Sequence, residues 1–195
     1  RSEATRRPDS PAALAVERLT LTDFRCYGRL RLELDARPVV LTGANGAGKT
    51  NLLEALSFLA PGRGLRSAKL AEVGRRSPGI EPGGSARPWG VAARLSGKTG
   101  AVEIGTGSEA ASETGRERRS LKIDGEPAKS QAALAELTAV VWLTPQMDRL
   151  FLEGPGARRR FLDRLVYGFD PAHAGRVAAY DHALRERSRL LTAGG

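Results

Sequence analysis

The sequence predicts an α/β fold built around one glycine-rich loop, with a small antiparallel sheet and a helical end. Three observations support this fold class. An apolar run at residues 38–42 leads into the glycine-rich segment 43–50, and a helical pattern follows at once. Short runs elsewhere alternate apolar and polar residues, which is the period of half-buried strands. From residue 157 onward, apolar positions recur with the spacing of amphipathic helices.

Length and composition limit what the chain can be. It has 195 residues, of which 41% are hydrophobic, enough for one domain with a core and a smaller lobe. Its formal net charge of +9 favours a polyanionic partner, because clustered cations attract phosphates and release their counterions. The chain is also rich in alanine, arginine and glycine, and a biased genome composition would produce the same charge. Charge alone therefore leaves nucleic-acid binding at even odds.

The number of cysteines and the spacing of the histidines indicate the cellular compartment and whether the chain binds a metal. The chain contains one cysteine, Cys26, which cannot form an internal disulfide, so we expect a reducing compartment. His173 and His182 are nine residues apart, which does not suit a metal-binding turn of helix. No apolar run approaches the roughly 20 residues that span a bilayer, and residues 1–15 lack the apolar stretch of a secretory signal. We expect a cytoplasmic protein without membrane contact, with a flexible segment at 1–15.

Strands are expected on the N-terminal side of the glycine-rich segment. Within residues 16–24 apolar side chains recur at Leu19, Leu21 and Phe24, and residues 30–34 alternate strictly between apolar and polar side chains, as half-buried strands do. Residues 38–42 form a short apolar run that ends at a glycine, which predicts a central strand buried on both faces. After the loop, residues 51–60 place leucines on one helical face before a Pro-Gly pair ends the helix.

The middle of the chain predicts an antiparallel sub-sheet. Three short runs have strand character, and an Asp-Gly turn pair closes the last of them. Loops rich in glycine and polar residues separate these runs. In chain order we expect a mobile loop at 74–90, strands at 91–95 and 101–104, a flexible hairpin tip at 105–119 and a strand at 121–123.

The last part of the chain is expected to be mostly helical. A helix at 131–137 precedes an apolar run at 139–143, which predicts a second buried strand ended by a Thr-Pro pair. Helices are then expected at 157–168 and at 171–192, the latter with proline in its first turn.

Residues 43–50 (GANGAGKT) match the pattern G-x-x-x-x-G-K-[ST], and we name them the phosphate loop. Gly43, Gly46 and Gly48 let backbone N–H groups curl around a β-phosphate, a conformation that side chains obstruct. Lys49 would bridge the β- and γ-phosphate oxygens, and the Thr50 hydroxyl would bind Mg²⁺. The loop therefore predicts a P-loop NTPase fold that binds ATP with Mg²⁺. Its candidate binding residues are Gly43, Ala44, Asn45, Gly46, Ala47, Gly48, Lys49 and Thr50.

Two further residues are weaker candidates for the same site. Arg66 would reach a γ-phosphate or DNA, although a solvated loop arginine is the commoner case. Gln146 follows the strand expected at 139–143 and would help to hold Mg²⁺ or a water, although a surface glutamine fits equally well. The residues alone leave both alternatives open.

A run of three arginines begins the helix expected at 157–168. Arg158, Arg159 and Arg160 would contact DNA phosphates there. Arg159 and Asp163 are four residues apart, so an ion pair on a solvated face fits equally well. The sequence does not decide between these interpretations.

Six segments occur in a fixed order along the chain. They are 21–27 (LTDFRCY), 43–55 (GANGAGKTNLLEA), 62–66 (GRGLR), 144–145 (TP), 154–166 (GPGARRRFLDRLV) and 183–191 (ALRERSRLL). Together they resemble the bacterial RecF family of DNA replication and repair proteins, which groups with the SMC and Rad50 heads among ABC-type ATPases. The resemblance covers nearly the whole chain after residue 15 and is far more specific than the phosphate loop alone.

The resemblance implies an ATP-dependent DNA clamp with an ABC/SMC-head-like fold. In such proteins two heads sandwich ATP as a homodimer, hold single-stranded or gapped duplex DNA, and work with RecR and RecO to load the recombinase RecA. It implies that the phosphate loop binds ATP, that Arg66 lies near the γ-phosphate, and that Gln146 takes the place of the Q-loop glutamine, where the family more often has glutamate. We expect an ATP-binding lobe at 16–156 and the start of a helical lobe at 157–195.

Two elements of an ABC-type site are absent from the sequence: the serine-glycine signature and a strand that ends in Asp-Glu. The run at 140–143 has no carboxylate after it until Asp148. We therefore interpret the chain as an N-terminal portion with an incomplete domain. We assign no catalytic residue in it, and we expect it to bind ATP without turnover of its own, because phosphoryl transfer depends on positioning and charge stabilisation.

Other functions fit parts of the sequence. A Rad50- or SMC-type ATPase head would use the same loop, but it needs long coiled-coil heptads. A basic DNA-binding module would carry the loop as a structural turn and would not hydrolyse ATP. A small-molecule kinase or a GTPase is disfavoured, the latter because the guanine motif [NT]-K-x-D is absent.

Overall fold

The chain forms two compact units. Unit 1 comprises Arg1–Ala55 and Ala68–Ala128, and unit 2 comprises Leu56–Ser67 and Lys129–Gly195. A computed structural model describes residues 14–76, 87–97, 100–108, 118–145, 147, 152 and 154–193. Within these ranges, no helix is long and apolar enough to cross a membrane.

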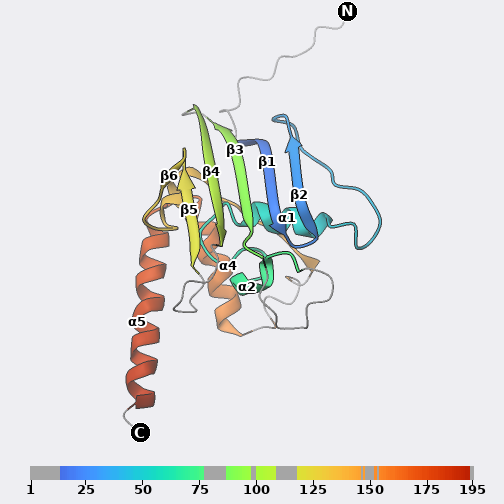
Figure 1. Cartoon of the computed structure of the whole chain (residues 1–195). Helices are drawn as coiled ribbons and strands as arrows, with labels where there is room; N and C mark the ends of the chain where they lie inside the picture. The colour runs from blue at the N-terminus through green and yellow to red at the C-terminus, as the bar shows by residue number, and fades with distance from the viewer. Residues whose placement is uncertain are drawn as a thin grey trace, which may run out of the picture. The chain divides into compact units, whose positions relative to one another are not determined.

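Unit 1 is built on a six-stranded antiparallel sheet with the strand order β2-β1-β3-β4-β5-β6 (Figure 1). The strands expected at 16–24 and 30–34 therefore belong to the same sheet as those expected at 91–95, 101–104 and 121–123. The strands are β1 (Ala15–Phe24), β2 (Tyr27–Glu33), β3 (Gly90–Gly97), β4 (Gly100–Ser108), β5 (Arg119–Ile123) and β6 (Glu126–Pro127).

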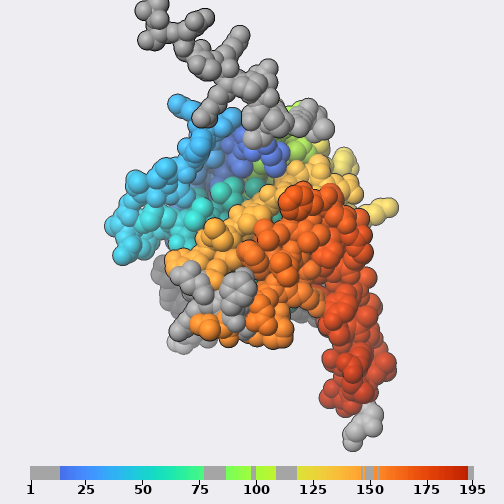
Figure 2. All heavy atoms as spheres, turned by 180° about the vertical axis from the view of Figure 1, so that it is seen from behind, coloured from blue at the N-terminus to red at the C-terminus, as the bar shows by residue number. Residues whose placement is uncertain are grey.

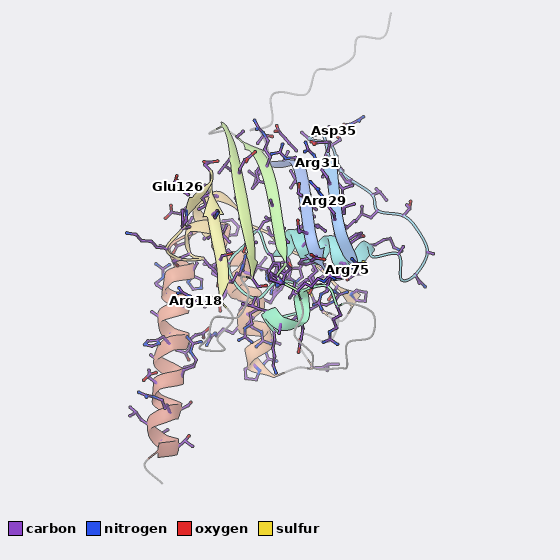
Figure 3. The ribbon with its side chains drawn as sticks, viewed as in Figure 1. Arg29, Arg31, Asp35, Arg75, Arg118 and Glu126 are labelled. Atoms are coloured by element: carbon purple, nitrogen blue, oxygen red, sulfur yellow. The ribbon has the colours of Figure 1, made fainter. Side chains whose placement is uncertain are left out.

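One face of this sheet is apolar and buried, and the other is polar. Leu19 and Leu21 of β1 are at most 2% exposed, and the buried face of β3 lies beside them. Removing such a side chain from water stabilises the fold by about 1.5–3 kcal/mol. Arg29 and Arg31 of the edge strand β2 are exposed, with one leucine between them (Figure 3). The predicted alternation of the early strands is confirmed.

An aromatic pair closes the core at one end of β1. The rings of Phe24 and Trp89 meet edge to face, with centroids 5.6 Å apart, and both residues are buried. The indole Nε1 of Trp89 donates to the carbonyl of Leu70 at 3.2 Å. Leu70 begins α2 (Leu70–Val73), a helix of one turn that the sequence did not predict.

Helix α1 (Lys49–Ser57) begins inside the phosphate loop. The sequence predicted a helix at 51–60, so the observed helix starts earlier and ends earlier. Residues 58–60 follow as a buried turn. Glu54 and Ala55 are the buried residues of α1 within unit 1, at 1% and 0% exposure.

Unit 2 contains three helices within its described residues: α3 (Ala133–Leu137), α4 (Pro155–Tyr167) and α5 (His173–Ala193). Thr138 caps the end of α3, and its buried hydroxyl lies 2.5 Å from the carbonyl oxygen of Leu59. Helix α5 projects beyond α4 (Figure 2), and Ala174 is its one buried residue in the described range. The helices expected at 131–137, 157–168 and 171–192 are confirmed to within a few residues at each end.

The two buried strands predicted at 38–42 and 139–143 are wrong. Both segments are loops, and Val40 and Leu143 are 83% and 81% exposed. A strand requires a hydrogen-bonded neighbour, and neither run pairs with another strand among the residues that the structure describes. An apolar run has the composition of a buried strand, but it does not specify a neighbouring strand to pair with.

Two expected loops fall partly outside the described residues. Of the mobile loop predicted at 74–90, residues 77–86 are not described. At one end of this segment Gly74 forms an antiparallel β-bridge with Phe24, and at the other end Trp89 is buried. Of the hairpin tip predicted at 105–119, residues 109–117 are not described, whereas β4 continues to Ser108 and β5 begins at Arg119.

Candidate nucleotide-binding site

The phosphate loop has a backbone conformation that depends on its glycines. Gly43, Gly46 and Gly48 have φ angles of 140°, 84° and 96°. These angles favour glycine, because a Cβ in this region collides with the neighbouring backbone. The Ala47 N–H donates to the Ala44 carbonyl at 3.2 Å and closes a turn in the middle of the loop. The predicted curl of the loop is therefore present in the structure.

Lys49 connects the two ends of this curl. Its Nζ donates to the carbonyl oxygens of Gly43 at 2.6 Å and Ala44 at 2.7 Å. An ammonium group has three donors, so one remains to be directed at an anion above the loop. The loop thus surrounds a fixed positive charge.

Helix α1 starts at Lys49, directly after the last glycine of the loop. The backbone N–H groups of Asn51 and Leu52 donate to the Gly48 carbonyl at 2.8 and 3.2 Å. The N-terminus of a helix carries a partial positive charge and favours anions. Thr50 lies exposed in the first turn, where its hydroxyl can reach a cation that accompanies the phosphates. Among the described residues no group of His, Cys, Asp or Glu could hold a metal ion.

The turn between β1 and β2 packs against the loop. Arg25 and Cys26 form this two-residue turn, because Phe24 pairs directly with Tyr27. An ideal Cβ built on Gly48 would lie 2.5 Å from the Tyr27 hydroxyl oxygen and 3.0 Å from the Cys26 sulfur. Burial, and secondly the nearby Cys26, raise the pKa of the Tyr27 phenol above its ordinary value.

Arg25 also ties the turn to α1. Its guanidinium makes two hydrogen bonds to the carboxylate of Glu54, from Nε to Oε2 at 2.8 Å and from Nη2 to Oε1 at 2.6 Å. Sequence reasoning missed this pair, because its members are 29 residues apart and no local pattern links them. Their segments, 21–27 and 43–55, both belong to the set that resembles RecF.

Residues 18–138 match the family described as an AAA domain. The chain belongs to this family. The match covers more than half of the chain and contains the phosphate loop, helix α1 and the whole sheet except the start of β1.

The AAA-domain chain also has relatives that match along almost its whole length. It is 54% identical over 181 residues to the DNA replication and repair protein RecF of Caulobacter vibrioides, covering 92% of the chain and 45% of that protein. The protein of the same name from Allorhizobium ampelinum is 50% identical over 179 residues, covering 92% and 46%. The predicted resemblance to RecF is confirmed. The chain spans about half the length of the curated relatives it matches.

Two solved structures share the fold of this AAA-domain chain. One is described as the recombination mediator protein RecF-ATPrS in the RecFOR pathway, with a TM-score of 0.77 at 23% identity, covering 94% of the chain and 46% of that structure's chain. The other, RecF-ATP, has a TM-score of 0.74 at 23% identity, covering 92% and 46%. The predicted α/β head fold is confirmed, over about half of the matched structures.

Two further residues were candidates for the nucleotide site, Arg66 and Gln146. Arg66 is exposed in the turn that follows Gly64, in unit 2, whereas the phosphate loop belongs to unit 1. Gln146 lies outside the described residues. The roles of Arg66 at a γ-phosphate and of Gln146 at Mg²⁺ stay predictions.

The three arginines expected to contact DNA lie in the first turns of α4. Arg159 pairs with Asp163 at 3.4 Å, as one sequence interpretation predicted, and more closely with Asp181 of α5 at 2.6 Å. Arg160 is exposed, and Arg158 is partly buried. Contact of these arginines with DNA stays a prediction, and Arg159 is already engaged in holding α4 to α5.

Proposed function

We propose that this chain binds ATP with Mg²⁺ through the phosphate loop. The observation that carries the proposal is the arrangement of Lys49, whose ammonium is held inside a loop of three glycines with positive φ. Solved structures of the same fold are described as RecF bound to ATP and to ATPrS, which supports the same ligand here.

Different residues of the loop would bind different parts of the triphosphate and its Mg²⁺. The backbone N–H groups between Gly43 and Gly48 would surround the β-phosphate, and Lys49 would bridge the β- and γ-oxygens. The Thr50 hydroxyl would take one position on Mg²⁺. We propose binding without turnover by this chain alone, because its sequence contains neither the serine-glycine signature nor an Asp-Glu strand.

We propose that the nucleotide site serves an ATP-dependent DNA-binding protein of recombinational repair and replication-fork maintenance. Its relatives are named for DNA replication and repair, and the net charge of +9 suits a polyanion. The proposed DNA is single-stranded or gapped duplex, and the proposed partners are RecR, RecO and a second copy of the protein. Together they would help to load RecA in the cytoplasm.

A direct test is equilibrium binding of a fluorescent ATP analogue with Mg²⁺ to the wild type and to Lys49→Ala. Loss of a charge-assisted hydrogen-bond donor costs about 1.5–3 kcal/mol, so the affinity is expected to fall about 10- to 100-fold. Lys122→Ala is the matched control, because Lys122 is an exposed lysine of β5 and the charge lost is the same. Equal affinity of Lys49→Ala and the wild type for the ATP analogue would contradict the proposal. It would favour a DNA-binding module in which the loop is structural.

A further inference from the structure

The ion pair between Arg25 and Glu54 is nearly removed from water. The Glu54 side chain is 1% exposed and that of Arg25 is 19% exposed. The two parallel hydrogen bonds, at 2.8 and 2.6 Å, use both carboxylate oxygens. Such a bidentate pair fixes orientation as well as distance, which a single contact does not.

Arg25 is held at several points besides this pair. Its third guanidinium nitrogen, Nη1, donates to the Glu72 carbonyl at 2.5 Å, and its backbone N–H donates to the Val73 carbonyl at 2.9 Å. Its φ of 52° lies in the left-handed region, which a residue other than glycine occupies only where its surroundings impose it. The turn is therefore fixed in one conformation, with α2 on one side and α1 on the other.

Glu54 is linked to the phosphate loop through helix α1. It lies on the same short helix as Lys49 and Asn51, and residues on one helix move together. At the helix start, the Asn51 side-chain amide donates to the Cys26 sulfur at 3.1 Å, beside the close approach of Tyr27 to Gly48. The β1–β2 turn thus contacts the loop and helix in two places: around Gly48 and Asn51, and at Glu54, three residues after Asn51.

We propose that Arg25 and Glu54 are positioning residues for the phosphate loop. They set the direction of α1 against the β1–β2 turn, so that the helix N-terminus and the Lys49 ammonium face the phosphates. This inference rests on the proposed binding of ATP by the loop. It assigns the pair a function in binding that goes beyond holding unit 1 together.

Stability and positioning can be separated by replacing both members with apolar side chains of similar size. Breaking a buried pair from one side leaves an unpaired charge, whereas replacing both partners often leaves stability unchanged. In Arg25→Met with Glu54→Leu we expect a melting temperature near that of the wild type, but affinity for the ATP analogue reduced about 10-fold, because the directional bonds are lost. Wild-type affinity in the folded double variant would overturn the proposal.

Glu54→Gln provides a second test, which does not depend on the double variant folding. It keeps the volume of the side chain and one acceptor oxygen but loses the charge. We expect several-fold weaker binding of the ATP analogue, together with shifted backbone amide signals of Gly48 and Lys49 in the absence of nucleotide. Ile104→Val is the matched control, because Ile104 is buried at 1% exposure in β4 and its change lowers stability without touching the turn. Glu54→Gln with wild-type affinity and unshifted amides would refute the positioning role.

The same assay distinguishes this inference from the proposed function. If Lys49→Ala weakens binding while Glu54→Gln and the double variant bind as the wild type does, the positioning role fails and ATP binding stands. If the wild type and Lys49→Ala bind the analogue equally, the proposed function fails, and the inference that rests on it falls with it.

Discussion

Gly48 of the phosphate loop and Tyr27 of the β1–β2 turn are packed so closely that a Cβ on Gly48 would lie 2.5 Å from the Tyr27 hydroxyl oxygen. The position also has a φ of 96°. Glycine is therefore required here twice over, by backbone angle and by space. The contact between Gly48 and Tyr27 links the phosphate loop to strand β2 of the sheet.

We predict that Gly48→Ala lowers affinity for the ATP analogue more than about 10-fold, because the loop must shift away from Tyr27 and its N–H groups turn from the phosphate. Gly46→Ala meets nothing within 4 Å but has a φ of 84°, so it should weaken binding less. Gly154→Ala, with open space and an ordinary φ of −61°, should bind as the wild type does. Titration of the three variants gives the ranking, and an unimpaired Gly48→Ala would contradict it.

A buried hydroxyl supports unit 2. The Thr138 hydroxyl lies 2.5 Å from the Leu59 carbonyl and 3.1 Å from the Leu134 carbonyl. We predict that Thr138→Val lowers the free energy of unfolding by about 1–3 kcal/mol, because a buried carbonyl loses its donor while the side-chain shape is kept. Thr22→Val, an exposed threonine of β1, should stay within about 0.5 kcal/mol. Urea denaturation measures both, and equal stabilities would show that the hydroxyl contributes nothing.

Arg119 gives unit 1 a dependence on pH. The side chain is partly buried, its Nε donates to the Thr106 hydroxyl at 2.8 Å, and burial lowers its pKa to about 10. Between this value and the higher pKa of arginine in the unfolded chain, the folded protein binds fewer protons than the unfolded chain, so this group makes stability rise with pH. Relative to Arg119→Met, the wild type should gain about 1 kcal/mol between about pH 9 and pH 11. Denaturation of both proteins across that range checks this, and a constant difference would contradict it.

The arginines of α4 allow a test of DNA contact that spares the pairing of α4 with α5. We predict that Arg158→Ala with Arg160→Ala weakens DNA binding about equally for all sequences and flattens the slope of log affinity against log salt, because phosphate contacts release counterions. Arg159 is left intact, since it binds Asp163 and Asp181.

The control for this experiment removes the same charge from another surface. Arg185→Ala with Arg187→Ala changes two exposed arginines of α5. If both double variants lower the slope equally, net charge alone explains the effect, and the α4 arginines form no specific contact surface.

Local patterns predicted most elements of this fold. The alternation in β1 and β2, the glycine spacing of the phosphate loop and the helical spacing of α4 and α5 depend on neighbours in sequence, and each is confirmed. The buried strands predicted at 38–42 and 139–143 failed, because burial on both faces depends on partners that an apolar run does not specify.

The site was predictable only in part for a similar reason. Lys49 and the loop glycines form a contiguous motif, so the sequence alone predicted them as candidates. Arg25 and Glu54 were not found, since their pairing depends on a left-handed turn that brings together segments 29 residues apart. The short helix α2, which accepts a bond from Arg25, has too few residues to show a period.

The central claim, that the phosphate loop is the ATP site, is tested most directly by following backbone amide signals in a nuclear magnetic resonance titration with ATP and Mg²⁺. We predict that the largest shifts fall on Gly46, Gly48 and Lys49, and that they are lost when Lys49 is replaced by alanine. Saturable binding that shifts other amides while leaving these three unchanged would contradict the claim.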